Sequence, residues 1–333
     1  MSYLLMPLKT ETLGLHNRLV FPPMATATAD KDGKARSSII DYYKEKAEGG
    51  YIGLIIIEHS YVSSSGKAGN NQLSICDNST IDGLKKIASG IQKNGTKAIM
   101  QLSHAGSATT SEITGNVPVA PSPIKNPRKG DMPRELSLRE INEIIEAFHD
   151  AAIRVKKSGF DGVEIHSAHG YLLNQFYSPL TNKRMDEYGG SLHNRIRIHL
   201  QIIESVRNAV GDDFPIFLRL GAADFTEGGT TLDDSITAAK EFEKAGVDVL
   251  DISGGMCGYV VPGLTGQAYF SPLSIAVRKV VSVPVLLTGG ITEVDTAESL
   301  LSKGAADLIG VGRAIYNDSK WAKYAIERAK AYL

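Results

Sequence analysis

Short apolar runs recur along the chain, and segments with a helical pattern separate most of them. Four runs share a local plan, in which a helical segment ends in Lys or Glu, a glycine follows and an apolar stretch begins: 48–57, 157–166, 244–253 and 303–312. Glycine suits the left-handed residue that follows a helix, and a continuous apolar stretch is typical of a buried parallel strand. Four further runs bring the number of expected strands to eight: 17–24, 96–102, 214–220 and 283–289.

The segments between these runs predict helices, and 138–157 has the clearest pattern. Ser137 and Glu140 have the spacing of a capping box at its start. Its apolar positions fall on one face of a helix, namely Ile141, Ile144, Ile145, Phe148, Ala152 and Val155. Similar patterns predict helices at about 80–94, 192–210, 233–245 and 293–303.

Eight strands that alternate with helices, with no break between two halves, predict a (β/α)₈ TIM barrel, and we expect one domain over 1–333. A doubly wound sheet is the alternative, but it normally has fewer strands, and no GxGxxG motif follows the first run. Two connections are too long to be simple turns. They are 103–136, after the third strand, and 253–271, after the sixth, and both lie where barrel enzymes build active sites.

Composition and charge narrow the class of partner. The 333 residues are 42% hydrophobic and 22% charged with a net charge of −1, which favours a soluble protein that binds neither nucleic acid nor membrane. The N-terminus has no signal-peptide pattern, and the longest apolar run is too short to span a bilayer. Cys76 and Cys257 lack CxxC spacing, so we expect a cytoplasmic protein with a small-molecule substrate.

A barrel would bring the residues at the strand ends to one mouth. In chain order they are Pro23, Met24, Ala25, Glu58, His59, Gln101, His166, His169, Arg219, Ser253, Gly289, Gly290, Gly312 and Arg313. The glycines after strands seven and eight, with Arg313, occupy the usual phosphate position of such barrels, although they could be turns alone. A nucleotide-like ligand held there would extend a ring toward Gln101 and Arg219. The alternative for the buried Arg219 is a purely structural role, in an ion pair with Asp224 or Asp251.

The stretch "GVEIHSAHGY" at 162–171 has three interpretations. Glu164, His166 and His169 could bind a metal ion, as in a metal-dependent barrel hydrolase, but the HxxH spacing lacks the HExxH form. Either histidine could instead be a core residue. The third interpretation makes the two imidazoles a pair of hydrogen-bond donors to a substrate oxygen, with Tyr171 placed to give a proton.

Along nearly its whole length the chain resembles the Old Yellow Enzyme family of FMN-dependent oxidoreductases. The resemblance rests on "LHNRLVFPPMAT", "GLIIIEHSYV", "MQLSHAGS", "LRLGAADF", "TGGI", "GVGRAIYND" and above all 162–197, "GVEIHSAHGYLLNQFYSPLTNKRMDEYGGSLHNRIR". In style it is most similar to the barrel domain of enoate and dienoyl-CoA reductases.

The resemblance implies a role for each residue at the mouth. Gln101 and Arg219 would bind the pyrimidine edge of the flavin, and Arg219 would stabilise the reduced, anionic flavin. Met24 and Ala25 would lie under or beside the flavin, and Pro23 would support its ribityl side. The phosphate would be held by Gly289, Gly290, Gly312 and Arg313, and Glu58 and Ser253 complete the expected cofactor-binding set.

On the substrate side, the resemblance implies that His166 and His169 bind the oxygen of an α,β-unsaturated carbonyl or nitro compound. NADH or NADPH would reduce the FMN, hydride would then reach the β-carbon, and Tyr171 would protonate the α-carbon. A flavin-binding protein without catalysis is the rival within this family. Homo-oligomer formation is left open.

The chain departs from the family pattern at two places. Ala25 and Ala27 stand where many relatives have Cys or Thr and an aromatic residue, so a side-chain donor to the flavin is missing at position 25. The cysteine-rich cluster and second nucleotide domain of the larger reductases are also absent from the sequence. We therefore expect electrons to come directly from a diffusing nicotinamide.

Overall fold

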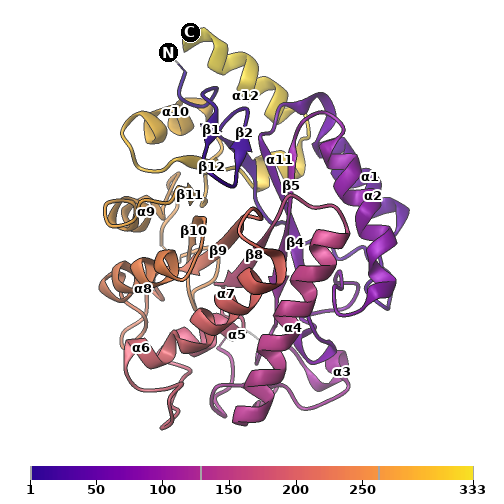
Figure 1. Cartoon of the computed structure of the whole chain (residues 1–333). Helices are drawn as coiled ribbons and strands as arrows, with labels where there is room; N and C mark the ends of the chain where they lie inside the picture. Colours follow the sequence, from indigo (N-terminus) through magenta and orange to yellow (C-terminus); the bar gives the residue numbers. More distant parts are fainter. Residues whose placement is uncertain (1, 128–129, 262, 333) are drawn as a thin grey trace.

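Eight parallel strands form a closed barrel in a computed structural model, which describes residues 2–127, 130–261 and 263–332 (Figure 1). The strands are β3 (Leu19–Phe21), β4 (Leu54–Tyr61), β5 (Lys97–Ser103), β8 (Gly162–Ser167), β9 (Ile216–Gly221), β10 (Val249–Ser253), β11 (Val285–Leu287) and β12 (Leu308–Gly310). Each pairs with the next in chain order, and β12 closes on β3. The predicted TIM barrel is confirmed.

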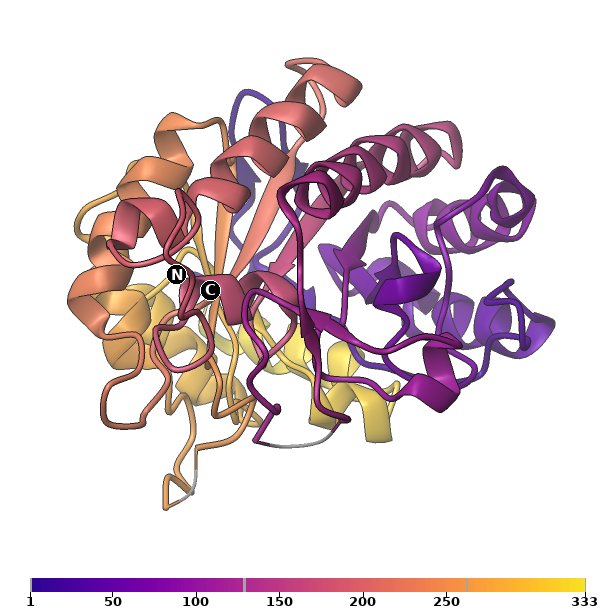
Figure 2. The same cartoon turned by 90° about the horizontal axis from the view of Figure 1, so that it is seen from below.

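Helices surround the strands (Figure 2). The main ones are α1 (Ser37–Lys46), α2 (Ile81–Gln92), α4 (Leu138–Lys157), α7 (Arg197–Val210), α8 (Leu232–Lys244), α9 (Ser271–Arg278), α10 (Val294–Ser302) and α12 (Trp321–Ala329). The capping box at Ser137 and Glu140 is present at the start of α4. Among the described residues, no helix is long and apolar enough to cross a membrane.

Two predicted elements differ from the observed ones. The helix expected over 192–210 is divided at Ile196 into α6 (Leu192–Arg195) and α7, because the backbone of Ile196, with φ −92° and ψ −3°, departs from regular helical angles. The first strand, expected over 17–24, ends at Phe21. Pro22 and Pro23 follow it, and proline has no N–H to donate to a neighbouring strand.

The interior of the barrel has an apolar end and a polar end. The apolar layer comes from every second residue of the strands, including Val20, Leu54, Ile56, Ile99, Phe217, Val249, Leu286 and Leu308. An antiparallel pair near the N-terminus, β1 (Leu8–Lys9) and β2 (Gly14–Leu15), packs Leu13 and Leu15 into this layer. One step further along the strands the inward residues become Gln101, Glu164, Arg219 and Asp251, so the carboxyl end of the barrel is polar.

The long connection after β5 has internal structure. It contains the short helix α3 (Ser111–Thr114) and two paired strands, β6 (Val119–Ala120) and β7 (Arg134–Glu135). The buried Arg184 ties this connection to the barrel, because its Nη1 donates to the carbonyls of Pro121 and Leu136 at 3.1 and 2.7 Å. The termini lie side by side (Figure 1).

Candidate active site

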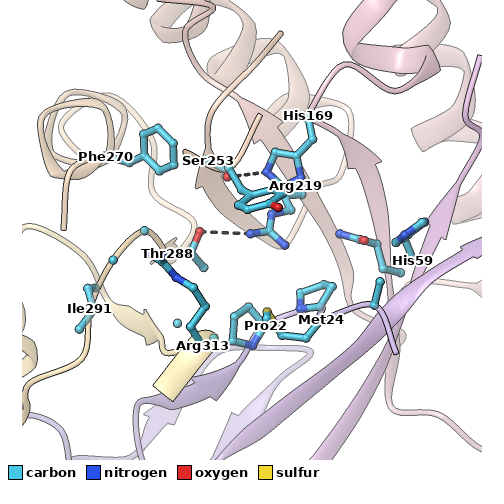
Figure 3. Close-up of a pocket in the computed structure, with 18 of the residues that line it drawn as sticks. Pro22, Met24, His59, His169, Arg219, Ser253, Phe270, Thr288, Ile291 and Arg313 are labelled. Atoms are coloured by element: carbon cyan, nitrogen blue, oxygen red, sulfur yellow. Dashed lines mark hydrogen bonds between the residues drawn. The ribbon is translucent and has the colours of Figure 1, made fainter. Parts of the chain in front are cut away.

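A cavity of about 380 Å³ opens at the polar end of the barrel. The predicted site residues that line it are Pro23, Met24, Ala25, Gln101, His166, His169, Tyr171, Arg219, Ser253, Gly289, Gly290, Gly312 and Arg313. Figure 3 shows several of the lining residues around one space, among them Met24, His169, Arg219 and Arg313. Of the residues expected at this site, the structure leaves Glu58 outside the cavity lining.

The floor of the cavity is a buried polar cluster. Gln101 Nε2 donates to Glu164 Oε1 at 2.7 Å. Arg219 Nη2 donates to Thr288 Oγ1 at 3.2 Å (Figure 3). Arg219 Nε lies 3.2 Å from Asp251 Oδ2, an ion pair with the carboxylate side chain fully buried. Of the two partners considered for Arg219 the structure therefore selects Asp251, and Arg219 still lines the cavity.

Burial sets the protonation of the two carboxyl groups in this cluster. It raises the pKa of Glu164 well above its ordinary value, and the nearby negative charge of Asp251 raises it further. Burial also raises the pKa of Asp251, to about 6, while the Arg219 charge opposes the shift. Burial therefore favours the protonated form of Glu164, while the Arg219 charge favours the ionised form of Asp251.

The glycines after β11 and β12 leave room that other residues would fill. Gly289 and Gly290 have φ values of +119° and +74°, and a Cβ on Gly290 would lie 2.6 Å from the Tyr269 ring. Gly312 and Arg313 line the same cavity at the start of α11 (Arg313–Asn317). Open backbone beside a positively charged side chain is the combination that suits a phosphate group.

The end of β8 and the turn after it bring three rings to the cavity, those of His166, His169 and Tyr171. His169 has a φ of +60°, a left-handed conformation that is uncommon for a residue other than glycine, and Gly170 follows with +72°. The amide of Gly170 donates to Asn174 Oδ1 at 2.8 Å, which fixes the turn to the buried helix α5 (Leu172–Tyr177). Tyr171 lies at the start of that helix.

The side chains of this turn form an arc. The ring centroids are 5.1 Å apart for His166 and His169 and 5.1 Å apart for His166 and Tyr171. Burial, followed by the positive neighbours, lowers the pKa of His166 well below its ordinary value, so its imidazole is neutral. His169 Nε2 makes a 2.8 Å hydrogen bond with Ser253 Oγ (Figure 3). The serine therefore orients the imidazole and also lines the cavity.

Glu58 lies elsewhere because β4 is irregular. Leu54 and Ile56 point into the barrel, and strict alternation would point Glu58 into the mouth. The pairing of β4 with β5 instead shifts between Ile57 and Ser60, so that two residues of β4 stand opposite one of β5. The Glu58 carboxylate accepts hydrogen bonds from Thr26 N and Oγ1 at 2.6 and 2.8 Å.

Glu58 predicts a pH dependence of stability. Burial raises its pKa from 4.5 to about 7. An acid whose pKa is higher in the folded state stabilises the fold most at low pH. The free energy of unfolding should therefore fall by about 3 kcal/mol as the pH rises from 4.5 to about 7. Glu58→Gln should remove that part of the dependence in denaturant unfolding, while the exposed Glu327→Gln should keep it. Equal pH profiles for wild type and Glu58→Gln would contradict this.

Several lining residues were not predicted as site residues. They are Pro22, His59, Tyr259, Tyr269, Phe270, Thr288, Ile291, Thr292 and Gly310. His59 was visible as a strand-end residue, but no role followed from its position. Tyr259, Tyr269 and Phe270 belong to the connection after β10, where Tyr269 Oη donates to the Tyr259 carbonyl at 2.7 Å.

The metal-site interpretation is not supported by the geometry. Within the described ranges, no group of three or more His, Cys, Asp or Glu side chains is arranged to hold a metal ion. Glu164 Oε1 accepts from Gln101, and His169 Nε2 is bonded to Ser253.

A family comparison decides the class. The model of the NADH:flavin oxidoreductase / NADH oxidase family matches residues 3–330. The chain belongs to this family. A relative named NADH oxidase from Thermoanaerobacter brockii is 44% identical over 95% of the chain and 49% of the relative. An NADPH dehydrogenase from Halalkalibacterium halodurans is 41% identical over 93% of the chain and 90% of the relative.

Solved structures agree with this assignment. An Old Yellow Enzyme homologue from Zymomonas mobilis superposes with a TM-score of 0.87 at 29% identity, over 98% of this chain and 93% of that one. A 2-naphthoyl-CoA reductase complex gives a TM-score of 0.92 at 30% identity, over 98% of this chain and 52% of that one. The chain spans about half the length of the first curated relatives, 49% and 48%. The predicted Old Yellow Enzyme family is confirmed.

The family makes FMN the cofactor, and the cavity fits it. Gly289 and Gly290 provide open backbone next to Arg313 at one end. At the other end Gln101 gives its Nε2 to Glu164, which leaves its Oε1 as an acceptor, while the Arg219 guanidinium supplies donors and positive charge. Such a pair complements a heterocyclic edge that carries both N–H and C=O groups.

Proposed function

We propose that the chain is an NAD(P)H-dependent flavin oxidoreductase of the ene-reductase type. NADH or NADPH is oxidised, hydride is passed to the β-carbon of an activated alkene, and a proton is added to the α-carbon. The substrate class is an α,β-unsaturated carbonyl or nitro compound. FMN, when bound, supplies the two-electron hydride chemistry.

The observation that carries the proposal is the convergence of His166, His169 and Tyr171 on the same cavity as Arg219 and Gln101. Imidazoles that line the cavity can donate hydrogen bonds to a substrate oxygen, and the negative charge that develops on that oxygen makes these bonds stronger in the transition state. Tyr171 lies beside them and carries a proton to donate. The names of the relatives, NADH oxidase and NADPH dehydrogenase, support nicotinamide as the electron donor.

Substrate access follows from the shape of the mouth. Tyr259 and Phe270 line the cavity, and Tyr259, which is 57% exposed, lies next to His169 with ring centroids 5.9 Å apart. Apolar rings beside the hydrogen-bond donors favour a planar, largely apolar small molecule with one polar oxygen. A non-catalytic flavin-binding protein is the rival that the experiment must separate.

The protein should purify with FMN or be loaded with it, bleach anaerobically with NADH or NADPH, and recover its colour when an enone or a nitroalkene is added. Stopped-flow absorbance measures the two half-reactions separately. Protein that takes up no FMN would refute the proposal. Protein that bleaches but is reoxidised by no member of an enone and nitroalkene panel would contradict the ene-reductase assignment and leave a flavin oxidoreductase with another acceptor.

A further inference from the structure

His59 is a third imidazole at the substrate end of the cavity. It lies in β4, where the register shift leaves Glu58 and His59 facing a single residue of β5. The shift turns Glu58 toward Thr26 and leaves His59 lining the cavity. Bulges of this kind often re-aim a side chain next to an active site. Figure 3 shows His59 at the side of the cavity formed by β4.

A buried glutamine fixes the tautomer of His59. The Ala68 amide donates to Gln72 Oε1 at 2.7 Å, so that oxygen is the acceptor end and Nε2 is the donor end. Gln72 Nε2 then lies 2.7 Å from His59 Nδ1 and also donates to the His59 carbonyl at 3.1 Å. Because Nδ1 accepts this bond, the ring proton is on Nε2, and a protonated ring would set a second N–H against the amide.

Tyr171 lies between two imidazoles from different strands. Its ring centroid is 5.3 Å from that of His59 in β4 and 5.1 Å from that of His166 in β8. The two imidazoles are 6.4 Å apart. Both histidines are ionisable rings packed against Tyr171, and burial lowers the pKa of His166 well below its ordinary value.

We propose that His59 is a positioning residue for Tyr171, whose phenolic oxygen it stabilises through Nε2–H while the phenol gives its proton to the substrate. This rests on the proposed function. In that step the Tyr171 O–H bond breaks, the α-carbon gains the proton, and the electron pair stays on the phenolate oxygen. A fixed donor aimed at the oxygen stabilises the charge where it develops, and it needs no rearrangement during the reaction. Solvent protonates Tyr171 before the next turnover.

The kinetic test compares two replacements in the FMN-loaded enzyme. His59→Phe keeps a ring without a donor and should slow reoxidation by enone roughly 10²-fold relative to reduction by NAD(P)H. His59→Gln retains an N–H donor and should recover part of that loss. His149→Phe, on the exposed face of α4, is the matched control and should match wild type.

A double variant separates this role from direct substrate binding. If His59 acts through Tyr171, His59→Phe should add little when it is introduced into Tyr171→Phe. An equal loss in both backgrounds would overturn the proposal, because His59 would then act independently of the phenol.

A second readout does not depend on enone turnover. In holoprotein labelled with carbon-13 at tyrosine Cζ, the resonance that disappears in Tyr171→Phe reports the ionisation of Tyr171. His59→Phe should move that ionisation to higher pH, and His59→Gln should move it less. An unchanged midpoint would overturn the His59 proposal even in an active ene-reductase. A shifted midpoint in a protein that reduces no enone would support the His59 contact and refute the proposed function.

Discussion

Tyr171→Phe should lower the rate of enone reduction by about 10²–10⁴-fold, the usual contribution of a positioned general acid. The phenyl ring preserves the packing against His166, so the loss reports the missing hydroxyl. Reduction of the flavin by NADH or NADPH needs no proton from this group and should proceed at close to the wild-type rate. Anaerobic stopped-flow absorbance measures both half-reactions in one instrument.

The control for this variant is Tyr324→Phe on α12, where the ring is 59% exposed and far from the cavity lining. It should behave as wild type in both half-reactions. Unchanged enone reduction in Tyr171→Phe would mean that solvent or another group delivers the proton, and the assignment of Tyr171 would then be wrong. Equal losses in both half-reactions would indicate a binding defect instead.

The sequence predicted most of the cavity because barrel topology makes local patterns global. Once eight strands alternate with helices, the residues at their carboxyl ends must converge, and Gln101, His166 and Arg219 needed no further information. Glu58, which was expected at the mouth, lies outside the cavity lining for a specific reason. Its orientation depends on how β4 pairs with β5, and a bulge is a property of two strands that neither sequence displays alone.

Strand register also explains why the sequence could narrow the partner of Arg219 to two residues but could not choose between them. Arg219 stands directly opposite Asp251 in the pairing of β9 with β10, and Gln101 stands opposite Glu164 in the pairing of β5 with β8. With strand positions alone, Asp224 was an equal candidate partner for Arg219. Its carboxylate instead accepts from the amides of Thr230 and Met256 and holds two connections together.

Arg219→Met should cost about 3–5 kcal/mol of unfolding free energy at neutral pH, because it leaves the buried Asp251 carboxylate without its cation. The flavin-free protein should be used for this measurement, since cofactor binding adds its own stabilisation. Urea unfolding followed by circular dichroism gives the free energy. The surface pair of Arg328 and Asp295 supplies the control, and Arg328→Met should cost far less than Arg219→Met, because solvent screens an exposed pair.

The loss of unfolding free energy in Arg219→Met should depend on pH and be smaller at acidic pH. Burial already raises the pKa of Asp251 to about 6, and the Arg219 charge is what opposes a larger rise. Without that charge the folded-state pKa rises further above the unfolded value. The stability is then greatest at low pH and is lost as the pH increases, so the difference from wild type should be smaller at acidic pH than at alkaline pH.

A double variant distinguishes a stranded charge from lost packing. Asp251→Asn removes the carboxylate, while Glu164, whose protonated form burial favours, keeps its hydrogen bond from Gln101. Arg219→Met with Asp251→Asn should therefore recover much of the stability that Arg219→Met loses, and its pH dependence should flatten. If the double variant is as unstable as the single one at every pH, the cost lies in packing around position 219, and Asp251 is not the charge that the arginine is needed to balance.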